Sequence, residues 1–247
     1  MTSRLPHLLE PYLSLPSSSS LVVLTSVLGA STNWLLCRHL YALLKPSHPH
    51  SSSSHNTNRP QTTRAALPPT NEDDGDVSVL LVSFLRDLTF WKENLSRLGL
   101  DLEAAARKGR FGERKVVLVI DGLDFVLAAS SPSLGPGDTA GTAMALMEMV
   151  MDLREKTHAA IITLAADDPL IKEQETALEK QHAWFALSMV HQADTLLNLR
   201  LLDTGAAKDV SGVIRITHGG EKSRTRDHEY LYHVGGDGGV RVFERGQ

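Results

Sequence analysis

The chain has 247 residues, of which 42% are hydrophobic and 22% are charged, and its formal net charge is −4 at pH 7. This length is enough for one substantial α/β domain, and the composition is ordinary for a soluble globular protein. The weak negative charge excludes a strongly basic nucleic-acid-binding chain, so any nucleic-acid contact must come from a local basic patch or from a partner subunit.

The single cysteine, Cys37, excludes an internal disulfide and favours a reducing compartment. We therefore expect the protein in the cytoplasm, with the nucleus as a second location. No apolar run approaches the ~18–20 residues that span a bilayer, so no membrane association is expected.

Residues 1–20 end in a proline and a run of serines, which predicts an N-terminal tail that wraps the surface. Residues 21–247 are expected to form a single domain, interrupted by a linker at 46–76. This linker is rich in serine, proline, histidine and threonine, so it cannot bury enough apolar surface to offset its ordering entropy, and we expect it to be disordered. Its histidines have no acidic or thiol partner at fixed spacing, so we expect no metal site.

The first part of the domain has the order strand, small-residue turn and helix, at 21–27, 28–33 and 34–45. This is the arrangement of a phosphate-binding loop, in which backbone N–H groups and a lysine hold the β- and γ-phosphates. The pattern G-x-x-x-x-G-K-[ST], laid on this segment, is substituted at every specific position. Ser26 and Ser31 stand at the glycines, Thr32 at the lysine and Asn33 at the Mg²⁺-binding hydroxyl.

The missing lysine bears directly on catalysis. A phosphate-loop lysine acts at close range in a poorly solvated site, where its charge contributes several kcal/mol. Thr32 cannot supply that charge, and Arg38 and Lys45 lie one or more helical turns further along the helix. We therefore predict no autonomous ATPase activity, no catalytic residue and no bound cofactor.

Strands and helices alternate after the linker. Strands are predicted at 77–84, 116–120 and 160–164, and helices at 90–98, at 102–108 and from a loop at 130–141 through 156. Asp168-Pro169 predicts an N-cap and a first-turn proline of a further helix. The long helix is expected to bury Ala143, Leu146, Met147, Val150 and Leu153, and its other methionines suggest contact with a neighbouring subunit as well.

The pattern changes past Asp194. Strand-like segments at 196–202, 210–217, 229–234 and 240–244 are separated by turns, as in antiparallel hairpins. The fold class is therefore α/β: a RecA-like three-layer domain, with a mainly parallel sheet and an antiparallel C-terminal edge.

Asp121 ends the apolar strand at 116–120. In phosphate-loop ATPases an acid at this place holds Mg²⁺, because the strand ends beside the loop. The alternative is a carboxylate that caps the following turn, and the residue alone does not decide between the two. We place Asp121 with Ser26, Ser31, Thr32 and Asn33 among the positions of a degenerate nucleotide site.

Four basic residues cluster in the C-terminal hairpins: Arg215, Lys222, Arg224 and Arg226. Basic side chains on flexible loops suit contacts to an RNA backbone that do not read sequence. The alternative is a solvated loop balanced by its own acidic residues. A base-stacking platform is less favoured, because only Tyr230 and Tyr232 lie nearby.

Several stretches together resemble subunit six of the Elongator complex, in its fungal version. They are Val77–Phe84 with Phe90–Leu95, Leu98–Leu102, Lys115–Ala129 around Asp121, and Asp194–Gly220. The resemblance covers roughly residues 21 to 247 without the linker, and it is stronger in arrangement than in any single motif. One departure is that almost nothing lies between Arg110 and Lys115, where the family usually has a further strand, so the local sheet order stays open.

The resemblance implies a RecA-like subunit without a working phosphate loop. Such subunits form a heterohexameric ring with subunits four and five, and the ring binds tRNA and supports modification of the wobble uridine at carbon five. The modification chemistry belongs to another Elongator subunit, and nucleotide hydrolysis is associated with the ring as a whole. Two other interpretations stay open: a divergent phosphate-loop ATPase, and a purely architectural adaptor that touches no RNA.

Overall fold

The computed structural model describes residues 4–45, 76–108, 114–130, 139–202, 207, 209–220 and 227–245. The strands are β1 Ser20–Ser26, β2 Val77–Ser83, β3 Lys115–Asp121, β4 Ala159–Ala165, β5 Thr195–Arg200, β6 Gly212–His218, β7 His228–Val234 and β8 Val240–Phe243. The helices are the short 3-10 helix η1 His7–Leu9, then α1 Glu10–Leu13, α2 Asn33–Leu44, α3 Leu88–Arg97, α4 Leu102–Lys108, α5 Phe125–Ser130, α6 Thr139–Glu155, α7 Asp168–Ile171 and α8 Ala177–Gln192.

Within the described residues the strands form one sheet in the order β2-β3-β4-β1-β5-β6-β7-β8. The pairs among β1 to β5 are parallel, and those from β5 to β8 are antiparallel. The predicted α/β fold with an antiparallel C-terminal edge is thus confirmed. β2 pairs directly with β3, which settles the order that the short 110–115 segment had left open.

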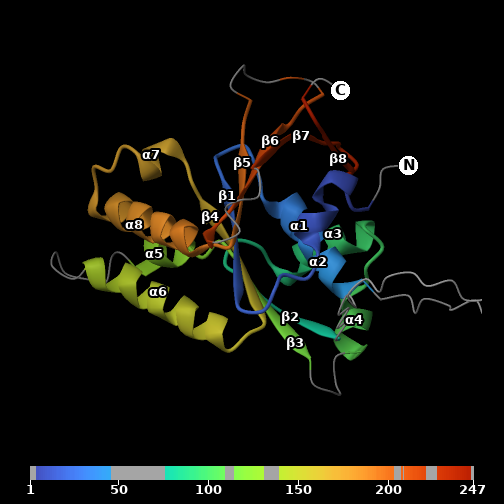
Figure 1. The fold of residues 1–247 in the computed structure, drawn as a ribbon, viewed down its shortest axis with the longest axis horizontal. Coiled ribbons are helices and arrows are strands. Elements are labelled where there is room, and N and C mark those ends of the chain that lie inside the picture. The colour runs from blue at the N-terminus through green and yellow to red at the C-terminus, as the bar shows by residue number, and fades with distance from the viewer. Residues whose placement is uncertain are drawn as a thin grey trace, which may run out of the picture.

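Helices cover both faces of the sheet, giving three layers (Figure 1). α1, α2 and α3 lie on one face, and α5, α6 and α8 lie on the other. β1 and β4 are apolar on both faces because they lie between these layers, as is usual for central parallel strands. Of the predicted core face of α6, Ala143, Leu146, Met147 and Val150 are buried, and Leu153 is half-buried.

The N-terminal segment corrects one expectation. Residues 1–20 were expected to be a tail on the surface, but η1 and α1 pack into the domain, and Leu9 and Leu13 are fully buried against α2. These leucines are four residues apart and therefore share one helical face. The i, i+4 spacing of Leu9 and Leu13 is hard to recognise in the sequence because prolines and serines surround it. The Tyr12 hydroxyl also bonds to Nδ1 of His228 on β7, at 2.8 Å.

The segment after β4 corrects a second expectation. The helix that starts at Asp168, α7, has only four residues, and its N-cap is Asp167 rather than Asp168. The long helix α8 starts later, at a capping box: the Thr176 hydroxyl accepts the N–H of Glu179, whose carboxylate accepts the N–H of Thr176. This reciprocal pair satisfies two donors that a helix start leaves free.

The short helix α5 was not predicted, and α6 starts at Thr139, inside the loop expected at 130–141; the remaining bounds differ from those expected by at most two residues. Apart from Asp76, which forms an ion pair with Arg114, the predicted linker at 46–76 lies outside the described residues. No helix in the described ranges has the length and apolar character needed to cross a membrane.

Candidate functional site

The predicted strand, turn and helix are present at the expected place. Ser26 is the last residue of β1, Thr32 is the N-cap of α2, and Asn33 is its first residue. Between them the chain makes a tight turn, in which the Ala30 N–H donates to the Val27 carbonyl at 2.9 Å and Gly29 has a φ of +90°. Only glycine adopts such a φ at little cost.

The backbone donors of this turn are largely occupied by the protein itself. The Val27 N–H donates to the Leu199 carbonyl, and the Leu28 N–H donates to the Asp167 carboxylate. The Asn33 N–H donates to Oγ of Ser31, at 3.2 Å. A phosphate-binding loop needs these donors free and pointing at the anion. The turn between β1 and α2 is therefore bonded internally.

The charge at this turn also differs from that of a phosphate site. The carboxylate of Asp167, which follows β4, accepts the N–H of Leu28. A bound phosphate would need backbone N–H groups of this kind as its donors. Arg38, one of the two cations nearest in sequence, donates its Nη2 to the carbonyl of Gly238 in the hairpin between β7 and β8, at 3.1 Å. The turn is thus hydrogen-bonded to the carboxylate of Asp167, and the guanidinium of Arg38 bonds to the β7–β8 hairpin instead of the turn.

Asp121 lies at the carboxyl end of β3, as predicted, and is 1% exposed. Its Oδ2 accepts the hydroxyl of Ser83 on β2 at 2.8 Å, and its Oδ1 accepts that of Thr163 on β4 at 3.0 Å. Thr163 in turn accepts the Gly122 N–H. The Asp121 carboxylate thus joins the ends of three strands, and the N–H of Gly122 in the following turn donates to Thr163 rather than to Asp121.

The charge of Asp121 acts on α2. The pKa of the buried Cys37 thiol is raised to about 11, mainly by burial and in smaller part by the carboxylate of Asp121, against the lowering effect of Arg38. Cys37 is therefore a protonated, inert thiol at neutral pH, as expected for a small buried side chain.

A half-buried acid near Asp121, Asp124, and a buried histidine, His182, were not predicted. Asp124 Oδ2 lies 3.9 Å from Nδ1 of His182 on α8 and accepts the Ala165 N–H at 3.3 Å. His182 Nε2 bonds to the Ala165 carbonyl at 3.0 Å, and since a carbonyl only accepts, Nε2 carries the hydrogen. Burial is the main cause that raises the pKa of Asp124, and the nearby His182 opposes it. The sequence signal was weak, because the two residues lie 58 positions apart.

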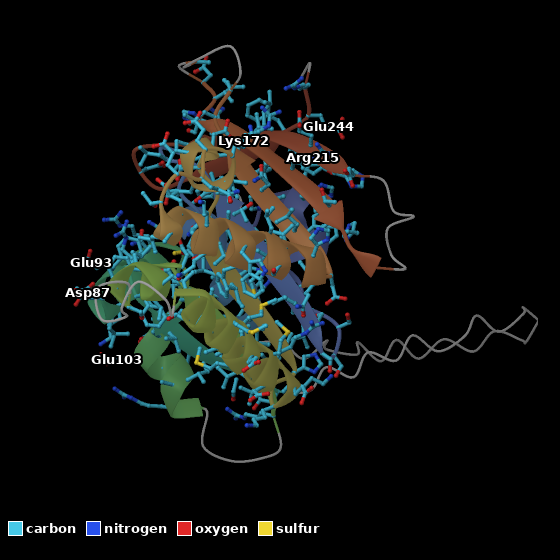
Figure 2. All side chains as sticks on the ribbon, turned by 90° about the vertical axis from the view of Figure 1, so that its left-hand side faces the viewer. Asp87, Glu93, Glu103, Lys172, Arg215 and Glu244 are labelled. Atoms are coloured by element: carbon cyan, nitrogen blue, oxygen red, sulfur yellow. The ribbon has the colours of Figure 1, made fainter. Side chains whose placement is uncertain are left out.

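The predicted basic cluster is only partly within the described residues. Lys222, Arg224 and Arg226 lie outside them. Arg215 lies on β6 with an exposed side chain, and its Nη2 bonds to Asp227 at 2.8 Å. This hydrogen bond, with the charge of Asp227, raises the pKa of Arg215. Figure 2 shows Arg215 on the C-terminal strands, far from Asp87, Glu93 and Glu103 at the other end of the molecule.

The aromatic residues near that cluster are not free for base stacking. Tyr230 and Tyr232 are 8% and 2% exposed, and the ring of Tyr232 packs 5.0 Å from that of Trp34. Among the described residues, no group of three or more histidine, cysteine, aspartate or glutamate side chains is arranged to hold a metal ion.

No protein-family model and no curated protein matches the sequence. The fold, in contrast, is similar to that of a KaiC-like protein from the hyperthermophilic archaeon Pyrococcus horikoshii OT3. Its crystal structure aligns with a TM-score of 0.55 and 12% identity over 98% of each chain. The chain therefore has the RecA-like fold, and at this identity the likeness concerns the fold alone.

Proposed function

We propose that this chain is a non-catalytic RecA-like subunit of a heterohexameric ring that binds tRNA. Its partners would be two RecA-like paralogues, Elongator subunits four and five, and the ring would support modification of the wobble uridine at carbon five. The RecA-like fold and the resemblance of the stretches around Asp121 and after Asp194 support this proposal. In this role the chain acts in the cytoplasm, with the nucleus as a second location.

The observation that carries the non-catalytic part is the turn between β1 and α2. Thr32 replaces the lysine that would neutralise the phosphates, and the Asp167 carboxylate occupies the Leu28 N–H. An anionic triphosphate would have to displace this carboxylate without gaining a cation in return.

The test is turnover of ATP and GTP by the purified chain alone, measured beside the assembled ring. We expect the chain alone to stay at the background rate, because it lacks the cation. Turnover by the lone chain that disappears in the Asp121→Asn variant would overturn the proposal.

The second candidate is a divergent phosphate-loop ATPase, favoured by Asp121 at the carboxyl end of β3. Isothermal titration of the chain with ATP and Mg²⁺ separates the two. Micromolar binding that depends on Asp121 would favour this candidate. An absence of binding heat would support a subunit that does not bind a nucleotide.

Exposed apolar side chains support assembly with partners. One group follows the edge strand β2 and the start of α3, namely Leu80, Phe84, Leu85 and Leu88, and another lies on α6 and α8, namely Met144, Met149, Trp184 and Leu187. Apolar patches of this kind mark protein interfaces when they are contiguous. Affinity purification of the tagged chain with mass spectrometry should recover two RecA-like paralogues. Recovery of the chain alone would contradict the ring.

The basic cluster gives the tRNA test. Replacing Arg224 and Arg226 by alanine in the assembled ring should weaken tRNA binding and lower its salt dependence by about one unit of slope per lost phosphate contact. Unchanged binding at several salt concentrations would remove this cluster from the proposal. If crosslinking of the ring to tRNA gave no adduct on this chain, the architectural adaptor would be favoured instead.

A further inference from the structure

A basic cavity lies on the face of the sheet that carries α1, α2 and α3. It has a volume of about 190 Å³ and is bounded by the N-terminal segment, α2, the end of α3 and the hairpin between β7 and β8. Its lining includes three arginines and one acidic residue: Arg4, Arg38, Arg97 and Asp237, with Asn94, Leu98, Gly238 and Gly239. None of these residues belongs to the turn after β1 or to the basic cluster around Arg215.

Arg38 is the buried member of this cavity, with only 5% of its surface exposed. Its Nη2 donates to the Gly238 carbonyl, but its Nε is buried without a hydrogen-bond partner in the part of the chain that the structure describes. It forms no ion pair among those residues either. A buried guanidinium without a carboxylate is costly, so a compensating anion would be stabilising here.

The acidic residue of the cavity does not neutralise Arg38. Asp237 Oδ1 accepts the Gly239 N–H at 2.9 Å, which closes the hairpin turn. Asp237 is also exposed, whereas Arg38 is buried. The positive charge of the cavity therefore remains in excess.

Arg4 and Arg97 add two further guanidinium groups at the exposed side of the cavity. Arg4 donates to the Tyr41 hydroxyl at 3.4 Å and lies against Gly99, where an added Cβ would come within 3.0 Å of Nη2. Arg97 ends α3 and has no ion pair or side-chain hydrogen bond within the described residues. Both groups therefore have donors to offer.

We propose that this cavity binds a phosphate group, held between Arg38 at its base and Arg4 and Arg97 at its mouth. Guanidinium groups match phosphate oxygens in geometry, with two parallel N–H donors to each anion. The volume is below the roughly 300–1,000 Å³ of pockets for drug-sized ligands, so it suits one phosphate rather than a whole nucleotide. The ligand is inorganic phosphate or the phosphate end of a small phosphomonoester.

The test compares the full-length chain with the double variant Arg4→Ala and Arg97→Ala, whose changes lie at exposed positions. Sodium phosphate up to about 10 mM, against chloride at equal ionic strength, is titrated by calorimetry and by thermal unfolding. At roughly ten times Kd we expect Tm to rise by about 3–6 °C, and Kd to increase about tenfold or more in the double variant. The matched control replaces two exposed arginines outside the cavity, Arg86→Ala and Arg107→Ala, and should bind phosphate as the unchanged chain does.

Further ligands distinguish the sources of the phosphate. Binding of AMP at least about tenfold tighter than of phosphate would assign the cavity to a phosphomonoester, and equal affinity would assign it to the free ion. The absence of both the heat and the Tm rise, or an equal response of the cavity variant and the unchanged chain, would overturn the proposal. Binding of a short RNA alone, sensitive to the double variant, would also overturn it in favour of a nucleic-acid backbone contact. None of these outcomes depends on the proposed ring.

Discussion

Two regions of this protein meet on α2, and they treat polar groups in opposite ways. At the start of α2 the turn after β1 and the carboxyl ends of β2, β3 and β4 are bonded to one another, through Asp121, Thr163 and Asp167. In the middle of α2, Arg38 and His39 are buried with nitrogen atoms that lack a partner within the described residues. The first region follows the strand–turn–helix course of an anion site but lacks a cation. The second region has a cation, Arg38, but no such turn.

This contrast shows that the shape of a loop is not sufficient for binding a phosphate. An anion site needs donors that no protein acceptor already uses. In the turn after β1 a carboxylate and two carbonyls use them, whereas the cavity around Arg38 leaves a guanidinium uncompensated. Substitutions in the first region should therefore remove hydrogen bonds and lower stability, whereas substitutions in the second region remove buried nitrogen atoms that have no partner in the described chain.

The largest effect is expected at Asp121. The Asp121→Ala variant leaves the buried hydroxyl of Thr163 and the half-buried hydroxyl of Ser83 without their acceptor, so the free energy of unfolding should fall by roughly 3–5 kcal/mol. Urea unfolding measures this loss. The Asp121→Asn variant keeps one acceptor oxygen and should lose less. Equal stability of the alanine variant and the unchanged chain would show that these bonds do not secure the strand ends.

His39 tests the second region. It is fully buried, its ring nitrogens have no partner in the described chain, and burial lowers its pKa to about 4. The unfolded chain takes up this proton near pH 6.5 and the folded chain only near pH 4, so the free energy of unfolding should fall by about 3 kcal/mol as the pH drops between these values.

The His39→Leu variant removes this contribution, and urea unfolding between pH 4 and 7 measures it. We expect a flatter pH profile for this variant and an unchanged profile for the control His7→Gln, at an exposed position. A profile of the His39 variant as steep as that of the unchanged chain would place the titrating group elsewhere.

A smaller effect is expected at Asp167. The Asp167→Ala variant removes the acceptor of the Leu28 N–H in an exposed turn, where water can replace the lost acceptor, so it should cost at most about 1 kcal/mol of stability. We expect it to gain no ATP affinity in titration calorimetry, because Thr32 still supplies no cation. Micromolar ATP binding by this variant would mean that the carboxylate alone blocks the site.

The smallest effect is expected outside both regions, at the exposed pair of Arg215 and Asp227. Since such pairs contribute little, the Arg215→Ala variant should change the free energy of unfolding by less than about 0.5 kcal/mol. Thermal unfolding at low and high salt checks this. A larger loss would show that the pair has a structural role that its exposure does not indicate.

The sequence was sufficient where one segment carries a repeating pattern. β1 and β4 each carry an unbroken apolar run of four residues, at 21–24 and 159–162, and α6 shows a 3.6-residue period, so strand, helix and core face are predictable from local residues. Asp121 was predictable as the residue that ends β3, although the sequence could not choose between its two interpretations.

The rest depends on contacts between distant segments. Arg4, Arg38 and Arg97 come from three separate parts of the chain, and the pair of Asp124 and His182 joins a loop to α8. Such sites have no spacing pattern, because the sheet order brings their members together. The N-terminal helices were missed for another reason. They contain few apolar residues, and the core role of Leu9 and Leu13 becomes visible only when their packing against α2 is known.

The docking of α1 has a practical consequence for anyone who shortens this protein. The serines before β1 invite a cut there, but a chain starting at residue 21 would leave two leucine-sized holes over α2 and strip the rings of His218 and His228 of their neighbour Tyr12. Low yield or aggregation of such a fragment would then reflect the missing core residues of the N-terminal segment. It would not show whether the full-length chain needs partner subunits.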